Sequence, residues 1–444
     1  MTSESDKGLG LFDSVLLVCG SVIGIGIFFT PSKIAEMVSS PEMFLAVWVV
    51  GGIFTLFACF SFAEMGAAYP REGGSYIYLL ELVGPLWAFL FGWSVVWIAS
   101  CGGLAIVASM FGSYVDDLFG LGGLDTQIGV AMLLAFGGVC ALGLRVGARF
   151  QSLLMLLKLA GIFALLYGGW RVAGSPVDPE PLLQETEGNS TGVGSFSLAL
   201  LPALFAYMGW ASLGNIANRL REPVRTLPRA ILMGMGGVIV VYVLLAAVYL
   251  HTVGLEGLRG NELFATEVAR FAFGPSGEIL FKIGFIISAA GVCLCSLLLL
   301  PWVTVAMAKN GHFFRVFGVV HPKTGAPFAS LAILVTASIS WMLVADTGLI
   351  LDAQGQNAII IDAVLMGGYL CALRRRTSLE RPYKSPFDPW IPHIFFALLV
   401  AMLVTQILEA SFELLGTSAA IILSGLVVYG PWRWLVARAD RAAQ

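Results

Sequence analysis

The sequence predicts an all-α polytopic membrane protein with twelve transmembrane helices. Of its 444 residues, 58% are hydrophobic and only 12% are charged, whereas a soluble domain carries roughly 25% charged residues. The mean hydropathy is +0.87. A helix needs about 20 apolar residues to cross ~30 Å of hydrocarbon, and apolar runs of about this length cover 11–38, 44–68, 85–115, 127–146, 150–171, 196–218, 229–252, 274–307, 328–345, 357–374, 391–409 and 413–437.

The runs are expected to be helices within one membrane domain. Hydrocarbon offers the backbone no hydrogen-bond partners, so a spanning segment must be a helix or part of a closed barrel. None of the runs shows the ten-residue alternation of a barrel strand. No connection between runs could hold a soluble domain. Residues 1–10 contain one lysine and no cleavage-site pattern, so we expect a short cytoplasmic N-terminus rather than a signal peptide.

The distribution of basic residues predicts the orientation. Short cytoplasmic loops of membrane proteins are enriched in Lys and Arg. If the N-terminus lies in the cytoplasm, 19 of the 25 Lys and Arg residues fall in inner connections. The outer connections are instead rich in Asp and Glu. We therefore expect a multi-pass protein of the plasma or inner membrane, with both termini cytoplasmic.

Cysteine and histidine positions predict neither disulfides nor a metal site. All seven cysteines fall inside apolar runs, away from outer loops, where an oxidising environment could join them. The closest pair, Cys293 and Cys295, is spaced so that the two thiols lie on different helix faces. The four histidines form no ligand cluster with them. We expect no cofactor, no metal and no nucleic-acid partner.

The order of the runs indicates an internal repeat. Runs one to five precede runs six to ten by about 185 to 207 residues. This offset predicts one five-helix unit at 11–171, a second at 196–374, and two extra helices at 391–437. Because each unit has an odd number of helices, the second is inverted relative to the first. Inverted repeats are typical of secondary transporters, whose binding site lies between the repeats at interrupted helices.

The first helix of each predicted repeat contains residues that weaken a helix. The first reads GSVIGIGIFFTP, at 20–31, and the second LPALFAYMGWASLGN, at 201–215. Interrupting a helix frees N–H groups at the start of one half and C=O groups at the end of the other, and these suit a carboxylate and an ammonium respectively. The alternative is close helix packing through the small-xxx-small pair Gly20 and Gly24. The matching second interruption favours a binding site.

Six sequence blocks resemble a known family. Besides the first interruption they are FAEMGAAYPREGGSYIYLLELVGPLWAFLFGW, FAYMGW, EPVRTLPRAI, AMAKNGHFF and LRRRTSLERPYKSP. In this order and over nearly the whole chain, they resemble the amino acid–polyamine–organocation (APC) superfamily, and most closely its L-type amino acid transporter (LAT) branch. The resemblance implies the LeuT-like 5+5 inverted-repeat fold with helices 1 and 6 broken. It also implies amino acid transport by alternating access, without enzymatic activity.

The resemblance also implies substrate contacts at the first break. Gly24, Ile25 and Gly26 would offer N–H groups to the substrate carboxylate, and Val22 and Ile23 would present carbonyls to its ammonium. The family often has a small or hydroxyl residue between the last two glycines. Ile25 supplies no hydroxyl, so only backbone donors remain there.

The second break would complete the site. Phe205 and Ala206 would present further carbonyls, and Tyr207 and Met208 would line the side-chain pocket. Phe205 matches the family's aromatic lid, and Trp210 is expected to act with it as a gate. Family members often carry an acidic pair after helix 6. This chain has NIANRLREP there, which puts an inner-gate ion pair built on that acid in doubt.

Lys158 is the expected coupling residue. It lies nine residues after Arg149, which is about 13 Å along a helix and well inside the hydrocarbon. Snorkelling towards the interface is one interpretation, but intramembrane lysines usually face an interior partner and mark function. In the family, a lysine of helix 5 faces the first break, where sodium-coupled relatives bind the ion. Lys158 would act there as a fixed cation or a proton carrier.

Substrate and coupling stay open at this stage. Bulky Ile25 and Met208, with no acid in either broken segment, favour a neutral, small or linear L-amino acid, moved by sodium-independent exchange or proton-coupled uptake. The alternative is a cationic amino acid or polyamine carrier. A channel lacks its polar rings, and an intramembrane enzyme lacks a catalytic dyad. Lys282 is expected to snorkel, and Asp362 to be an outer interfacial group rather than a proton carrier.

The outer loop YVDDLFGLGGLD contains no cysteine. Some relatives are disulfide-linked to a single-span glycoprotein, and that link could not form through this loop. We therefore expect no disulfide-linked heavy chain. The oligomeric state stays open.

Overall fold

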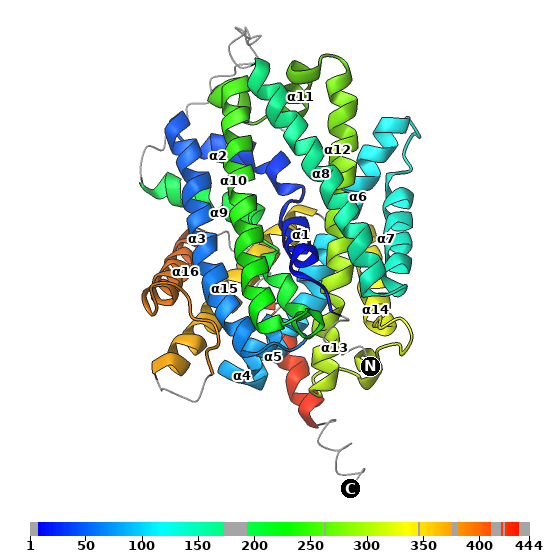
Figure 1. Ribbon diagram of the computed structural model, residues 1–444, viewed down its shortest axis with the longest axis vertical. Coiled ribbons are helices and arrows are strands. Elements are labelled where there is room, and N and C mark those ends of the chain that lie inside the picture. The colour runs from blue at the N-terminus through cyan, green and yellow to red at the C-terminus, as the bar shows by residue number, and fades with distance from the viewer. Residues whose placement is uncertain are drawn as a thin grey trace.

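The computed structural model is an all-helical bundle whose long helices mostly follow one axis (Figure 1). It describes residues 8–172, 193–261, 263–344, 347–374, 380–409, 419–420 and 422–434. The α-helices are α1 Leu11–Val22, α2 Thr30–Met37, α3 Pro41–Ala68, α4 Ser75–Leu82, α5 Pro85–Ser94, α6 Ser100–Phe119, α7 Asp125–Ala141, α8 Leu144–Val172, α9 Val193–Ala206, α10 Pro223–Leu258, α11 Phe264–Phe273, α12 Ser276–Leu299, α13 Pro301–Lys309, α14 Phe328–Val344, α15 Thr347–Arg374 and α16 Trp390–Glu409. Residues 422–434 are also helical.

Several of these helices are long and apolar enough to cross a membrane. Within the described ranges, seven segments meet this condition, namely Pro41–Ala68, Pro85–Phe119, Leu144–Arg171, Phe196–Asn215, Pro223–Leu258, Ser276–Lys309 and Asn357–Arg374. Shorter apolar helices lie at Leu11–Val22, Asp125–Ala141, Phe328–Val344 and Trp390–Thr405. The predicted class of all-α polytopic membrane protein is therefore confirmed.

Proline and glycine set many of the helix ends. Helices α3, α5, α10 and α13 each have a proline at their start, where the missing N–H costs nothing. Gly84, at φ +127°, separates α4 from α5. The short helices α4 and α11 lie between the predicted spans. The sequence does not predict them as spans, because a helix of eight to ten residues is too short to cross a membrane.

The two predicted interruptions are present as breaks in the helical backbone. The first run divides into α1, the 3₁₀ turn η2 at Gly26–Phe28, and α2. The sixth divides into α9 and two 3₁₀ turns, η4 at Trp210–Asn215 and η5 at Ala217–Arg219. A third irregularity is the π-helical turn η3 at Val95–Ala99, which joins α5 to α6.

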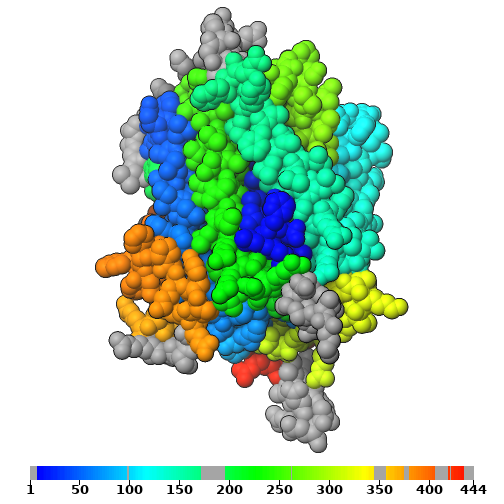
Figure 2. Space-filling model, in the orientation of Figure 1, coloured from blue at the N-terminus to red at the C-terminus, as the bar shows by residue number. Residues whose placement is uncertain are grey.

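Helix α1 is the centre of the arrangement. It packs against α10, α8 and α12, and against the turn η4 that follows α9. Its first turn reaches the surface between α10 and α8 (Figure 2), where Phe12 is 67% exposed. Its last turn is buried, since Leu17, Val18 and Val22 have almost no solvent contact. The first break therefore lies deep inside the protein.

Candidate functional site

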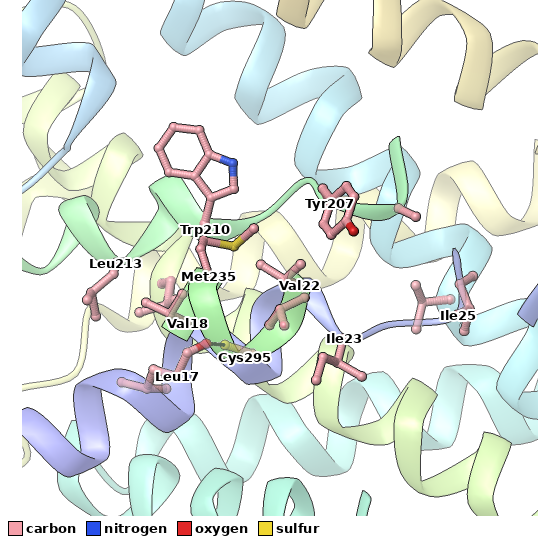
Figure 3. Packing of buried hydrophobic residues seen from close by; sticks show 14 of the residues in the cluster. Leu17, Val18, Val22, Ile23, Ile25, Tyr207, Trp210, Leu213, Met235 and Cys295 are labelled. Carbon is pink, nitrogen blue, oxygen red and sulfur yellow. Dashed lines mark hydrogen bonds between the residues drawn. The ribbon is translucent and has the colours of Figure 1, made fainter. Parts of the chain in front are cut away.

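The first break is a short extended segment in the protein interior. Helix α1 ends at Val22, and Ile23 has φ −69° and ψ +89°, outside the helical region. Regular geometry resumes only at η2, which begins at Gly26. Figure 3 shows the chain leaving the helix at Val22 and running through Ile23 to Ile25.

This segment leaves two consecutive N–H groups without a protein acceptor. The Gly24 N–H interacts with the Tyr242 hydroxyl, whereas within the described residues the amides of Ile25 and Gly26 make no hydrogen bond. Both residues are buried, with Ile25 only 7% exposed. A buried, unpaired N–H costs roughly the free energy of a lost hydrogen bond, so such groups call for a ligand. Two adjacent donors at the start of a helical turn suit an anion such as a carboxylate.

The carbonyls of the same segment already accept hydrogen bonds. The Val22 carbonyl oxygen accepts from the Tyr242 hydroxyl at 2.9 Å, and the Gly24 carbonyl oxygen accepts from the Ser288 hydroxyl at 3.1 Å. The Ile23 carbonyl oxygen accepts from the Lys158 ammonium group. Each carbonyl oxygen has a second lone pair, so these contacts hold the segment in place without exhausting its capacity.

Lys158 is buried on α8, with 3% of its surface exposed, and it reaches the break rather than the membrane interface. A methyl group at Gly291 of α12 would lie 3.4 Å from the Lys158 Nζ. The ammonium group therefore occupies the space between α1, α8 and α12. Two turns earlier on α8, Gln151 is fully buried, and its amide nitrogen and oxygen find no hydrogen-bond partner in the described part of the chain.

The second break lies directly against the first. Helix α9 ends at Ala206, and the chain turns at Gly209, whose φ of +114° favours glycine. A methyl group on Gly209 would lie 2.3 Å from the Ser21 carbonyl oxygen, and one on Gly26 would lie 3.2 Å from the Ala206 Cα. The missing side chains thus let the two backbones touch. Gly209 stands within the stretch 201–215 whose glycines predict the second break, but the sequence did not predict its contact with Ser21.

A cavity of about 330 Å³ lies at the meeting point of the two breaks. Helices α3, α4, α5, α6, α12, α13 and α15 and the turn η3 supply its remaining walls. The cavity includes most of the residues predicted for the site, namely Val22, Gly24, Ile25, Gly26, Phe205, Ala206, Met208 and Trp210. The volume falls at the small end of the range for small-molecule sites.

Two of the predicted substrate-contact residues, Tyr207 and Ile23, do not line this cavity, and neither does the predicted coupling residue Lys158. The Tyr207 ring is fully buried beside Trp48 and Tyr242, and its hydroxyl donates to the Trp48 carbonyl at 3.1 Å. Tyr207 therefore anchors α9 to α3 and α10, because the turn after Ala206 rotates it away from its neighbour Met208. Ile23 contributes its carbonyl to Lys158, while its side chain packs in the core.

The two predicted gate residues each contact an aromatic ring. The Phe205 ring lies 6.0 Å from the Phe29 ring, which places α9 against the start of α2. The Trp210 ring meets Phe62 of α3 edge-on at 5.0 Å. Both Phe205 and Trp210 line the cavity, so their movement would change access to it.

Asp362 was interpreted as an outer interfacial group, and the structure corrects this. It lines the cavity together with Asn357, Ala358 and Ile361. The hydropathy run begins at residue 357, but α15 begins ten residues earlier, at Thr347. The polar stretch DAQGQN is helical and hides this start, so Asp362 lies near the middle of the helix rather than near its end.

Charged residues tie the segments together at the end of the bundle where α3 and α13 finish. Glu72 pairs with Lys309 and accepts from the Asn218 amide at 3.2 Å. Arg219 stacks over Trp302 at 3.7 Å from the ring centre. Sequence reasoning missed this cluster because Glu72 and Lys309 lie far apart in the chain. Asn218 lies in the stretch NIANRLREP and contacts the acid Glu72.

One further predicted position, Lys282, is held by ion pairs. Lys282 bonds to Asp117 and Glu278, each at 2.8 Å, so it is paired at its end of α12 rather than merely snorkelling.

All seven cysteines are free thiols. The described residues contain no group of three or more His, Cys, Asp or Glu side chains that could hold a metal ion.

The fold and the cavity define a class: a polytopic helical membrane protein with a buried cavity where two interrupted helices meet. The amino acid permease family profile matches residues 9–430, and the chain belongs to this family of membrane transport proteins. The chain is 28% identical to the serine/threonine exchanger SteT of Bacillus subtilis (strain 168), over 95% of this chain and 96% of the relative. It is 28% identical to the b(0,+)-type amino acid transporter 1 of Rattus norvegicus, over 96% and 88%. It is 24% identical to the cystine/glutamate transporter of Homo sapiens, over 94% and 84%.

Proposed function

We propose that the protein moves neutral, small or linear L-amino acids by alternating access, through sodium-independent exchange or proton-coupled uptake. The observation that carries this proposal is the pair of buried N–H groups of Ile25 and Gly26, which have no acceptor among the described residues and belong to residues that line the cavity. A carboxylate is the anion common to all amino acids. Backbone donors alone would hold the substrate's carboxylate, and the substrate's side chain would then contact the other walls of the cavity.

The ammonium group would bind on the opposite side of the cavity. The Ala206 carbonyl oxygen accepts no hydrogen bond from the described residues, and Ala206 borders the cavity. We propose that it accepts from the substrate ammonium with the carbonyls of Val22, Ile23 and Phe205. Each of these already has a protein donor or a turn contact, so the ammonium would use the second lone pair.

Lys158 would replace a sodium ion. Its ammonium group is bonded to the Ile23 carbonyl, so a fixed positive charge already stabilises the carbonyl end of α1. We propose that this makes transport independent of sodium, and that Lys158 couples the state of the break to the packing of α8 and α12. Phe205 and Trp210 would act as gates at the cavity, and Met208 would limit the size of the substrate side chain.

We propose the following architecture and topology for this activity. Residues 11–171 and 196–374 would form two inverted five-helix repeats of a LeuT-like fold, followed by two helices at 391–437, with both termini in the cytoplasm. The paired breaks at Ile23 and Gly209 support the repeat. No disulfide-linked heavy chain is proposed, because the loop at 114–125 has no cysteine.

Exchange is favoured over uniport because one relative, the serine/threonine exchanger SteT, aligns with this chain over almost its whole length. A cationic amino acid carrier is the second candidate, since another aligned relative is a b(0,+)-type amino acid transporter and the acid Asp362 lines the cavity.

Counterflow in proteoliposomes tests the proposal. Vesicles loaded with unlabelled alanine, serine, threonine, leucine, lysine or arginine are diluted into each labelled amino acid, with sodium or choline outside and with or without a pH gradient. We expect saturable uptake of small neutral amino acids that depends on internal substrate and is equal in sodium and choline. Preference for lysine or arginine, or strict dependence on sodium, would contradict the proposal.

A further inference from the structure

Helix α15 contributes a polar side to the cavity that neither break provides. Asn357, Ala358, Ile361 and Asp362 all line the cavity. At about 100° per residue these four positions cover an arc of about 140° on one face of a helix. Asp362 is the only charged residue among those that line the cavity.

Asp362 lies near the middle of α15. Helix α15 has 28 residues, and Asp362 is about 22 Å from its first residue and about 18 Å from its last at 1.5 Å per residue. Its carboxylate makes no hydrogen bond or ion pair with the described residues. An acid held inside the bilayer is costly and is retained where it meets a partner or a transported species. The missing partner therefore comes from the cavity.

We propose that Asp362, with Asn357 on the same wall of the cavity, binds the hydrogen-bond donor on the substrate's side chain. This inference rests on the proposed function, in which the two breaks hold the carboxylate and the ammonium of the substrate. The side chain is then the part left to face the other walls. Hydroxyl and ammonium groups are the donors that amino acid side chains can offer, so the preferred substrates carry one of these groups.

The cavity offers a route by which a donor can reach Asp362. Ile361 and Ala363 on either side are buried, α15 packs against α16, α4, α6 and α5, and Asp362 itself lines the cavity. A hydrogen bond to a charged group contributes about 1.5–3 kcal/mol. An amino acid with the donor would thus be favoured about tenfold or more over an analogue of equal size without it.

Isosteric substrate pairs test this directly. Threonine and valine differ by a hydroxyl for a methyl group, and lysine and 2-aminoheptanoic acid differ by an ammonium for a methyl group. The half-saturation constant for each is measured in counterflow on the native protein, Asp362→Asn and Asp362→Leu. Alanine, which has no side-chain donor, serves as the internal control for folding and transport.

We expect the native protein to prefer the donor member in at least one pair by about tenfold or more. Asp362→Leu removes this preference, which is read from the ratio of half-saturation constants within each pair and not from the absolute rate of alanine transport. Asp362→Asn, which keeps an oxygen acceptor without the charge, retains the threonine preference if the hydroxyl is the donor and loses the lysine preference if the ammonium is. The two pairs therefore distinguish the two sources of the donor.

Three results would overturn the inference. One is equal affinity within both pairs for the native protein. Another is a preference that survives in Asp362→Leu. The third is that the Asp362 variants change the pH dependence of transport for every substrate, alanine included, while the ratio of half-saturation constants within each pair stays the same. Asp362 would then bind a proton rather than the substrate side chain. Failure of the native protein to transport any amino acid would refute the proposed function and is distinct from all three.

Discussion

Gly209 gives the sharpest test of the contact between the two breaks. In Gly209→Ala the new methyl group would lie 2.3 Å from the Ser21 carbonyl oxygen, whereas ordinary contact begins at 3.4 Å. The two backbones must separate by about 1.1 Å, the difference between these distances. Alanine at φ +114° adds about 1–2 kcal/mol of backbone strain. A shift of about 1 Å at a reacting site can cost about 10²-fold in rate.

We therefore expect alanine counterflow in Gly209→Ala to fall about 100-fold at equal protein per vesicle. Gly237→Ala is the matched control, because Gly237 is exposed on α10 and a methyl group there meets no atom within 4 Å. Alanine is the better helix former by about 1 kcal/mol, so the control stays folded and active. Native rates in Gly209→Ala would refute the close contact of the two breaks.

Two further predictions concern the charged groups around the site. Lys158→Ala leaves the buried Ile23 carbonyl without its donor, which costs about 1–3 kcal/mol. We expect lower thermal stability in detergent and strongly reduced counterflow, and native exchange rates in Lys158→Ala would dismiss its coupling role. For the pair of Glu72 and Lys309, a double-mutant cycle with Glu72→Gln and Lys309→Met measures the coupling in thermal stability. We expect about 0.5–1 kcal/mol, and additive effects of the two substitutions would show that the pair contributes nothing.

The helices were the easiest part to predict from the sequence. The length of the apolar runs is enough to predict α3, α10 and α12, because every apolar residue in a spanning helix is stabilised by the lipid in the same way. The break at Gly24 and Gly26 was also predictable, since glycine in a spanning helix weakens it without adding contacts. The short helices α4 and α11 were not, because they are too brief to register as spans.

The orientation of side chains at the second break was not predictable. Tyr207 and Met208 are neighbours in the sequence. Helical periodicity does not predict where their side chains point, because the helix ends at Ala206. The structure places Met208 at the cavity and Tyr207 against Trp48. This choice depends on a hydroxyl partner more than 150 residues away in the chain.

Polar residues at a distance in the sequence were the largest omission. Asp362 was misplaced because the apolar run in the sequence begins ten residues after the true start of α15. The polar residues in between are also helical. The contact of Asn218 with Glu72 joins two loops that no local pattern connects. Only the packing of the helices brings these residues together.

The central claim is that backbone N–H groups at the first break bind the substrate carboxylate. Ile25→Pro removes one of these donors, and the Ile25 φ of −79° fits the proline ring. Ile25→Ala is the control that shortens the side chain and keeps the N–H.

The deciding measurement is inhibition of labelled alanine counterflow by unlabelled alanine and by alaninamide, which lacks the negative charge. The ratio of the two inhibition constants is compared between Ile25→Pro and Ile25→Ala. We predict that Ile25→Ala keeps a strong preference for alanine, and that Ile25→Pro loses about tenfold of it. An equal preference for alanine in both variants would contradict carboxylate binding by the backbone of this segment.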